Sequence, residues 1–534
     1  MNTWTNIPVA EQLWLFSPMI ALTATMLAVV ACPLIAGRSS RVVAGTAAVG
    51  ILAAFICALR VVNAVDGGGV SGLSTQPAAG LLIVDSLSAV FQVLLIAFLG
   101  AVSYLWWIGS AEKEQNAPEF FILLIGSALG MAMMVSSANL LTIVIAIEVA
   151  SLPSYAIVGF DKRDRLGAEA SLKYMIFGAV CAAIMLYGAS LLYGLVGSLS
   201  VVDVAQYTVA QLTNGGSRLL TLAALMCFFA GIGFKISAVP FHFWCPDAFE
   251  GAKVEVTTWL SVVSKAAGLI LLTRLVLIVC GAVSSPLAMS IVSPLAWSIG
   301  AIAAVTCTVG NFAAYKQTSV KRLLAYSSIA HAGYMMMAAA VFLHPQTAGY
   351  TSGLTSLLVY IAIYLLMNLG AFTVTALVAW DSGHDRIEAF TGLIRRSPWL
   401  AIPMVVCLMS LVGLPPMAGF IGKWWILMAL GSTQTTLGWL LIVVAGLNTL
   451  FSLYFYMRIV VRMTLKDDDR PAIDAPLGGV ALVNVCAVAL LLLFVFAQPM
   501  RAAAERFTQR LNPTSTTLSP VRQATVAVSP KGAE

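Results

Sequence analysis

The sequence has 534 residues, of which 60% are hydrophobic and 10% are charged, and its formal net charge is +6. A soluble domain carries about 25% charged residues, so this mixture cannot build a soluble surface, and we expect a polytopic membrane protein. No basic run with interleaved aromatic residues indicates a nucleic-acid partner.

The nine cysteines lie apart and mostly within apolar runs, and no two of them have the spacing of a metal or redox site. They are expected to fill small spaces in a core. The sequence also has no Walker loop, haem motif or Fe–S spacing. We therefore expect no metal, nucleotide or redox cofactor in this chain.

A membrane-spanning helix needs about 20 mostly apolar residues, and about fourteen such runs follow one another along the chain. The first run has no basic segment before it, which favours a retained membrane helix over a signal peptide. A polar stretch from Gly67 to Pro77 predicts one longer loop, and residues 512–534, rich in Ser, Thr and Pro, predict a disordered tail. The predicted spans are residues 14–36, 41–63, 82–108, 118–136, 138–160, 168–195, 217–239, 256–281, 291–313, 323–343, 351–380, 399–430, 436–463 and 477–498.

Basic residues gather in alternate loops between the predicted spans, and the intervening loops are almost free of them apart from Arg218. Cytoplasmic loops carry the excess of Lys and Arg, so the loops rich in basic residues are predicted to be cytoplasmic. With an even number of helices, this alternation places both termini outside the cell. Arg501, Arg506 and Arg510, after the last span, depart from the pattern. The loops predicted to be cytoplasmic carry Arg38 and Arg41; Lys113; Lys162, Arg163 and Arg165; Lys253; Lys316, Lys321 and Arg322; Arg386, Arg395 and Arg396; and Arg458, Arg462, Lys466 and Arg470.

Several ionisable residues fall inside predicted spans, and the strongest candidates among them are Glu148, Lys235, Lys265 and Lys423. An ionisable side chain in a membrane helix is costly unless it is paired or hydrated, and it is a functional candidate by default. The lysines outnumber the buried acid, so ion pairing alone does not account for them. An excess of buried lysines suits a proton relay, because desolvation penalises the charged form of the ammonium group. A structural ion pair or a snorkelling side chain is the alternative for each residue.

Four weaker candidates lie nearby in the sequence. Glu169 and Lys173 are spaced i,i+4 with Glu first, the favourable order on a helix, and either a local structural pair or a functional role fits them. His242 follows a proline in a polar break and either passes protons or caps a broken helix. His331 has two serines one turn earlier, so it either faces water or packs through hydrogen bonds.

Prolines interrupt two of the lysine-bearing spans. Pro240 follows Lys235 by five residues, whereas Pro415 and Pro416 precede Lys423. Proline breaks a helix, and backbone freed at membrane depth is tolerated only inside protein or along water. The mirrored order of lysine and break is the pattern that an inverted-topology repeat produces, and transporters often place their sites at such breaks.

Five stretches from about residue 80 to 470 carry a family resemblance: SANLLTIVIAIEVASLPSYAIVGF, EASLKYMIFGAVCAAIMLYGASLLYG, FKISAVPFHFWCPDAFEGA, TVGNFAAYKQTSVKRLLAYSSIAHAGY and GLPPMAGFIGKWWIL. The chain resembles the antiporter-like family of respiratory complex I and the multisubunit cation/proton antiporters, and within it subunit N of bacterial NADH:quinone oxidoreductase. The resemblance implies an all-α membrane fold of fourteen helices with two inverted five-helix repeats. The expected parts are residues 1–110 (helices 1–3), 111–285 (helices 4–8), 286–465 (helices 9–13), 466–500 (the last helix) and 501–534 (a polar, disordered tail).

The resemblance also implies roles for single residues. Glu148 would be the helix-five glutamate that faces Lys235, Lys265 the lysine of the central axis, and Lys423 the distal lysine of the second half. His242 would be the histidine of the broken helix, and Glu169 and Lys173 match family positions whose role is less settled. Where the family usually has Pro-Thr-Pro-Val, this chain has Lys253-Val254-Glu255-Val256, which predicts an altered start of the following helix.

These observations predict proton translocation coupled to quinone reduction elsewhere in an NADH:quinone oxidoreductase. NAD, FMN, Fe–S clusters and quinone are expected in partner subunits, with another antiporter-like subunit as a neighbour, in the lipid of a bacterial inner membrane. Two alternatives remain open at this point: a subunit of a multisubunit Na⁺/H⁺ antiporter, and a non-conducting scaffold subunit of a related membrane hydrogenase.

Overall fold

The structure is a computed structural model that describes residues 13–36, 39–66, 80–110, 116–214, 217–282, 286–342, 349–468 and 470–509. Within these ranges the regular structure is helical, and only isolated β-bridges join extended residues. The predicted loop from Gly67 to Pro77, the loop with Lys113 and the predicted tail from residue 512 lie outside the described residues.

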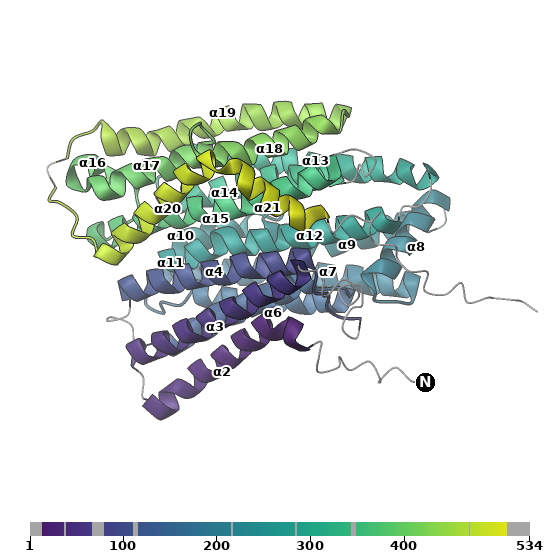
Figure 1. Ribbon diagram of the computed structural model, residues 1–534, viewed down its shortest axis with the longest axis horizontal. Coiled ribbons are helices and arrows are strands. Elements are labelled where there is room, and N and C mark those ends of the chain that lie inside the picture. Colours follow the sequence, from purple (N-terminus) through teal and green to yellow (C-terminus); the bar gives the residue numbers. More distant parts are fainter. Residues whose placement is uncertain are drawn as a thin grey trace, which may run out of the picture.

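The helices lie side by side along one common direction (Figure 1). The first group is η1 (Trp14–Phe16), α2 (Ser17–Ala36), α3 (Ser40–Asp66) and α4 (Ser86–Ser110). The second is α5 (Ala117–Ser136), α6 (Leu140–Val158), α7 (Arg165–Val196), α8 (Val201–Asn214), α9 (Arg218–Ile236), α10 (Trp244–Gly251), α11 (Val254–Trp259), η2 (Leu260–Ser264) and α12 (Lys265–Ala282). The third is α13 (Pro286–Ala314), α14 (Val320–Phe342), α15 (Gly349–Ser382), η3 (Ile387–Phe390), α16 (Leu393–Arg396), α17 (Pro398–Val412), α18 (Ala418–Ser432) and α19 (Thr436–Thr464), followed by α20 (Leu477–Val495) and α21 (Ala497–Gln509).

Twelve helices among the described residues are long and apolar enough to cross a membrane, so the chain is a multi-pass membrane protein. Two parts of the predicted fourteen fall outside this set. One is α14, which has two charged residues, Lys321 and Arg322, in its first turn. The other is the pair α17 and α18, which have only 15 residues each. If α14 and the pair α17–α18 also cross, the number is fourteen, and this count stays a prediction.

The same packing pattern occurs twice along the chain. Helix α5 packs on α6 and α13 packs on α14, while α7 contacts the two-piece helix α9–α10 and α15 contacts the two-piece helix α17–α18. Helix α12 then returns to α5, and α19 returns to α13. This correspondence is the arrangement that the repeat hypothesis predicts, although the exact limits of the two repeats stay a prediction.

Both two-piece helices end their first half at a residue with left-handed backbone. Ser237 (φ 63°) follows α9, and Gly413 (φ 84°) follows α17. Each is followed by a cis X-Pro bond, at Val239–Pro240 and at Pro415–Pro416. The breaks predicted from the prolines are therefore present. The first begins two residues after Lys235, and the second ends seven residues before Lys423.

A buried ion pair joins Asp85, the residue before α4, to Arg274 of α12. Arg274 donates two hydrogen bonds of 2.8 Å to the carboxylate of Asp85 and a third to the Val135 carbonyl oxygen. Burial by itself would raise the pKa of Asp85, but the charge and hydrogen bonds of Arg274, together with hydrogen bonds from Ser88, bring that pKa below its usual value. The carboxylate therefore stays charged, and the pair holds the first three helices against the second group.

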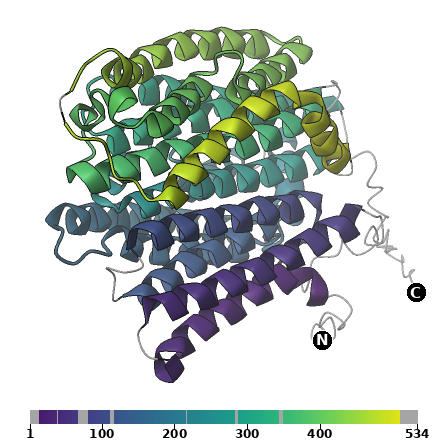
Figure 2. The same ribbon diagram turned by 60° about the vertical axis from the view of Figure 1, so that its left-hand side comes forward.

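Helix α21 corrects one sequence prediction. The tail was expected to begin at residue 501, whereas the structure has a helix over Ala497–Gln509. It turns away from α20 and lies across the ends of α15 and α4 (Figure 2). The Thr508 hydroxyl meets the Thr355 hydroxyl at 2.9 Å, and the Arg501 guanidinium lies 5.6 Å from the Trp425 ring centroid. This helix is too short and too charged to be predicted as a membrane span from the sequence, and tertiary contacts hold it in place.

Candidate functional site

Lys235 is the first of three buried lysines, and it lies one residue before the end of α9. Its ammonium group donates a 3.0 Å hydrogen bond to the hydroxyl of Ser151 on α6, and that hydroxyl donates to the Ile147 carbonyl oxygen. Glu148 lies three residues before Ser151, about one helical turn. The Glu148 carboxylate interacts electrostatically with Lys235 without forming a direct ion pair. The structure thus brings together the two residues that were expected to face each other.

The helix break after Lys235 leaves a buried histidine nitrogen without a partner. His242 is 7% exposed, and its Nδ1 atom has no hydrogen-bond partner. The break is held locally by the Trp244 indole, which donates a 3.1 Å hydrogen bond to the Phe234 carbonyl oxygen. Backbone and side chain therefore fix the path from α9 to α10, while the His242 ring keeps an unused polar atom.

Lys265 is fully buried and begins α12 directly after the π-helical segment η2. Its ammonium group donates to the Cys245 sulfur at 3.4 Å. It also lies over two aromatic faces, 4.7 Å from the Phe249 ring centroid and 5.7 Å from that of Trp244. All three partners belong to α10, so this eight-residue helix forms the surroundings of the central lysine.

Two contacts place Lys265 between the other lysines. The hydroxyl of Ser264, which precedes it, donates a 3.5 Å hydrogen bond to the Lys235 carbonyl oxygen. In the other direction, Cys245 contacts the Ser328 hydroxyl of α14 at 4.0 Å. Cys245 is therefore a point of contact between the second and third groups of helices, beside the central lysine.

Lys423 uses backbone atoms that the second helix break sets free. Its ammonium group donates to the carbonyl oxygens of Leu411 (3.2 Å) and Val412 (2.8 Å) at the end of α17. A helix end carries unpaired carbonyl groups and partial negative charge, so this end favours a cation. The lysine stem lies over Gly413, where an added Cβ would meet its Cδ at 2.9 Å. The Tyr334 ring lies 4.4 Å from the ammonium nitrogen.

His331 lies in a cluster of hydroxyl groups on the Lys423 side of the molecule. Its Nδ1 atom shares a 2.7 Å hydrogen bond with the Tyr360 hydroxyl, and its Nε2 atom lies 3.4 Å from the Tyr456 hydroxyl. Tyr456 in turn bonds to the Ser327 hydroxyl. The hydroxyl-lined face predicted around His331 is present, and it includes tyrosines from α15 and α19 that sequence spacing did not reveal.

Glu169 and Lys173 do not join the buried lysines. They form a 2.8 Å ion pair on the outer face of α7, and Lys173 also pairs with Asp247 of α10 at 3.0 Å. Arg322 of α14 completes the row by pairing with Asp247 at 2.7 Å and with Glu250 at 2.5 Å. A chain of alternating charges therefore runs from the α7 surface across α10 to α14.

The departure from the family pattern at Lys253-Val254-Glu255-Val256 falls at the start of α11, which begins at Val254. The Lys253 ammonium lies 5.5 Å from the Phe160 ring centroid, and Glu255 is 2% exposed. The helix forms here without the usual prolines. The altered geometry of this start stays a prediction.

The segments that carry these residues are similar to known proteins. Residues 137–449, more than half of the chain, match the family described as "NADH:quinone oxidoreductase/Mrp antiporter, TM". The chain belongs to this family. The NADH-quinone oxidoreductase subunit N of Anaeromyxobacter sp. (strain Fw109-5) is 38% identical over 442 residues, covering 79% of this chain and 83% of that protein. The corresponding protein of Rubrobacter xylanophilus is 35% identical over 508 residues, covering 93% and 99%.

A solved structure agrees with this assignment. A chain of respiratory complex I from Thermus thermophilus with bound aureothin superposes with a TM-score of 0.72 at 29% identity, covering 92% of this chain and 99% of that chain. The expected resemblance to subunit N and the expected antiporter-like fold are confirmed. The roles of Glu148, Lys235, Lys265 and Lys423 are untested by this similarity and stay predictions.

Proposed function

We propose that this chain is the proton-translocating N-type subunit of an NADH:quinone oxidoreductase, and that protons pass through its buried lysines. The observation that carries the proposal is the surroundings of Lys235, Lys265 and Lys423. All three ammonium groups are buried, and their direct hydrogen-bond partners are a hydroxyl, a thiol and two backbone carbonyl groups. None of these partners carries a full charge, so they offset only part of the cost of burying an ammonium group, and this favours release of the proton.

Glu148 is the residue that sets the charge on Lys235. When the carboxylate approaches, it stabilises the ammonium form; when it turns away, burial favours loss of the proton. Lys235 and Glu148 already interact through space while Lys235 bonds to Ser151. The hydroxyl lies one turn from the carboxylate, so a short side-chain movement exchanges one partner for the other.

The released proton would next reach Lys265, because Ser264 joins the backbone of Lys235 to the start of α12. From there Cys245 and Ser328 lead to the His331 cluster, and Lys423 lies beyond it. His242, with its unused nitrogen, offers a second acceptor at the first helix break. Water molecules would close the remaining gaps.

The energies are compatible with pumping. Moving one elementary charge against about 150 mV costs roughly 3.5 kcal/mol, from about 2.3 kcal/mol per 100 mV. Two unit charges about 4 Å apart interact by about 4 kcal/mol at an effective dielectric constant near 20. The free energy of forming or separating one ion pair is therefore similar to that needed to move one proton across the membrane.

In this proposal the chain works as one subunit of a translocase. Quinone reduction takes place in partner subunits, which carry NAD, FMN, Fe–S clusters and quinone, and a neighbouring antiporter-like subunit lies beside this chain. The complex lies in the bacterial inner membrane, with both termini of this chain on the periplasmic side.

The assembly is tested by purifying the tagged chain from its native membranes in mild detergent and identifying the accompanying chains by mass spectrometry. Fe–S and quinone-site subunits are expected. Because the family also contains Mrp antiporters, an alternative is a sodium/proton antiporter subunit. Recovery of small and antiporter-like membrane chains alone, with sodium-dependent pH changes in the absence of an electron donor, would select that alternative.

The relay is tested by two substitutions of Lys235. Lys235→Met removes the proton carrier, and Lys235→Arg keeps the charge but not the ability to release a proton. We expect both to reduce proton pumping at least tenfold in an assembled complex, measured as vesicle acidification per NADH oxidised. Lys162→Met, in an exposed loop, is the control and should pump normally. Normal pumping by an assembled Lys235→Arg complex would show that Lys235 is only a structural charge.

A further inference from the structure

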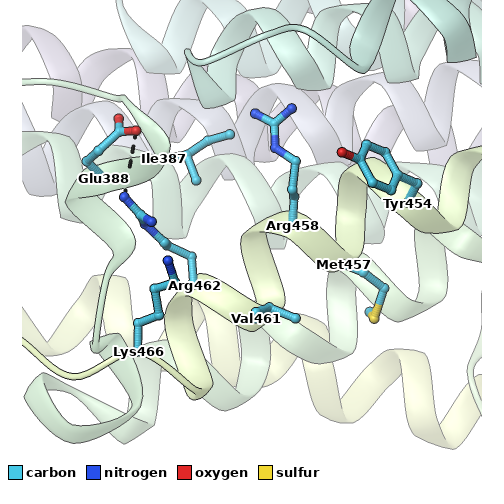
Figure 3. A pocket seen from close by; sticks show the side chains of 8 residues that line it. All are labelled: Ile387, Glu388, Tyr454, Met457, Arg458, Val461, Arg462 and Lys466. Atoms are coloured by element: carbon cyan, nitrogen blue, oxygen red, sulfur yellow. Dashed lines mark ion pairs between the residues drawn. The ribbon is translucent and has the colours of Figure 1, made fainter.

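A basic groove lies at the end of α19, on the side predicted to be cytoplasmic. It encloses about 400 Å³ and opens to the surface (Figure 3). Arg458 and Arg462 are four residues apart on α19, so they share one face of that helix, and Lys466 lies two residues beyond the helix end. The residues that line the groove are Ile387, Glu388, Tyr454, Met457, Arg458, Val461, Arg462 and Lys466.

The positive charge of this groove is only partly compensated. Glu388 is the one carboxylate in the lining, and it lies 3.9 Å from Arg462. Arg458 donates to the carbonyl oxygens of Tyr315 and Gln317, which are neutral acceptors. The Nε atom of Arg462 is buried and has no hydrogen-bond partner. Three cationic side chains against one carboxylate, with one unused donor, form a site for an anion.

The groove is polar at one end and apolar at the other. Figure 3 shows Lys466 and Arg462 at one end and Tyr454 and Met457 at the other. Tyr454 precedes Arg462 by eight residues of α19, which is about 12 Å along the helix axis. The apolar stripe continues past Tyr454 along the same face of α19, through the exposed side chains of Val443, Leu447 and Leu450.

We propose that this groove binds an anionic phospholipid, with its phosphate at Arg462 and Lys466 and an acyl chain along the apolar stripe of α19. Basic pockets between helices on the cytoplasmic side of a membrane suit such headgroups. A free phosphate ion would use the cations alone and would leave Val443, Leu447 and Leu450 without a role. The exposed stripe directly below the cations therefore favours a lipid as the source of the phosphate. The proposal does not depend on the lysine relay.

The test compares phospholipid binding by the complex purified with its native partners and washed in mild detergent. Phosphatidylglycerol or phosphatidylcholine is added, and bound lipid is counted by native mass spectrometry. A cation near the membrane surface contributes about 1 kcal/mol to binding of an anionic lipid, about fivefold in affinity. We expect Arg462→Gln with Lys466→Gln to weaken phosphatidylglycerol binding about 25-fold, with phosphatidylcholine binding unchanged.

Two matched variants keep the test independent of folding. Arg395→Gln removes a cation on the same side that pairs with Asp467 at 2.7 Å outside the groove, and it should bind lipid like the unaltered protein. Glu388→Gln removes the one carboxylate in the lining and should strengthen phosphatidylglycerol binding. An unchanged affinity in both the Arg462/Lys466 double variant and the Glu388→Gln variant would overturn the proposal.

Two further experiments distinguish a phospholipid from a free phosphate ion or a protein subunit in the groove. Inorganic phosphate that displaces phosphatidylglycerol at similar concentration would show an anion site without lipid preference, and would overturn the lipid assignment. A photo-crosslinking residue at Val461 should form an adduct with phospholipid. An adduct with another polypeptide instead would show that a protein subunit covers the groove.

Discussion

At the scale of single residues, the central lysine shows how weakly a buried charge is held here. Lys265 has a thiol and two aromatic faces around its ammonium group. A thiol is a weak hydrogen-bond acceptor, and aromatic faces contribute about 0.5–2 kcal/mol to a cation. Cys245 is therefore a positioning residue for Lys265, because among the described residues it is the hydrogen-bond partner of the ammonium group.

Substitution of Cys245 tests this contact. Cys245→Ala removes the acceptor and should lower proton pumping several-fold while the complex still assembles. Cys245→Ser keeps an acceptor of similar size, so pumping should recover and its pH profile should follow that of the unaltered protein. Vesicle acidification per NADH oxidised, measured across pH, is the readout. Equal pumping and one pH profile in both variants would reduce Cys245 to a packing role.

Residue type alone predicted the lysines but not their partners. Lys235, Lys265 and Lys423 stood out because charge is rare and costly in apolar spans. Cys245 did not, since a single buried cysteine without metal spacing is the expected core filler. The tyrosines Tyr360 and Tyr456 around His331 come from distant helices, and no spacing rule links residues so far apart in the chain.

At the scale of elements, α10 connects a charged surface with the central lysine. On one side Asp247 and Glu250 pair with Lys173 and Arg322. On the other side Cys245 holds Lys265. A change in the surface ion pairs would move or loosen an eight-residue helix that has few internal hydrogen bonds, and so would change the surroundings of Lys265.

Arg322 is the residue that tests this connection. Arg322→Gln leaves Asp247 and Glu250 without their shared partner, so we expect a several-fold loss of pumping per NADH oxidised in an assembled complex. Arg322→Lys keeps the charge and should recover part of it. Lys173→Gln should have a smaller effect, because the side chains of its pair with Glu169 are 44% and 60% exposed and solvent screens such a pair. Normal pumping by an assembled Arg322→Gln complex would show that the surface ion pairs of α10 do not affect Lys265.

The helices were predicted well where one apolar run made one straight helix. The span expected at 118–136 is α5 (Ala117–Ser136), and that expected at 436–463 is α19 (Thr436–Thr464). The span expected at 399–430 consists of two helices, α17 and α18. The π-helical segment Leu260–Ser264 had no signal, because a π-helical turn depends on tertiary packing more than on composition.

At the scale of the whole molecule, orientation and helix number are coupled. The beginning of α2 and the end of α21 lie at the same side of the molecule, and α16 lies at the opposite side (Figures 1 and 2). This is the placement that an even number of crossings predicts. Composition could not decide between twelve and fourteen, since α14 begins with charges and α17 and α18 are short.

The side of the loop around His384, between α15 and α17, distinguishes the two numbers. If α14 and the pair α17–α18 both cross, this loop is cytoplasmic, as Arg386, Arg395 and Arg396 predict. If neither crosses, it lies outside. We expect a protease-cleavable tag at His384 to be cut in inverted vesicles but not in intact spheroplasts. A tag between Lys162 and Arg163 should behave in the same way, whereas a tag at the C-terminus should be cut from outside. Cleavage at His384 in spheroplasts would show that only twelve helices cross the membrane. The pair α17–α18, which carries Lys423, would then not cross it. Lys423 would no longer belong to the proposed relay.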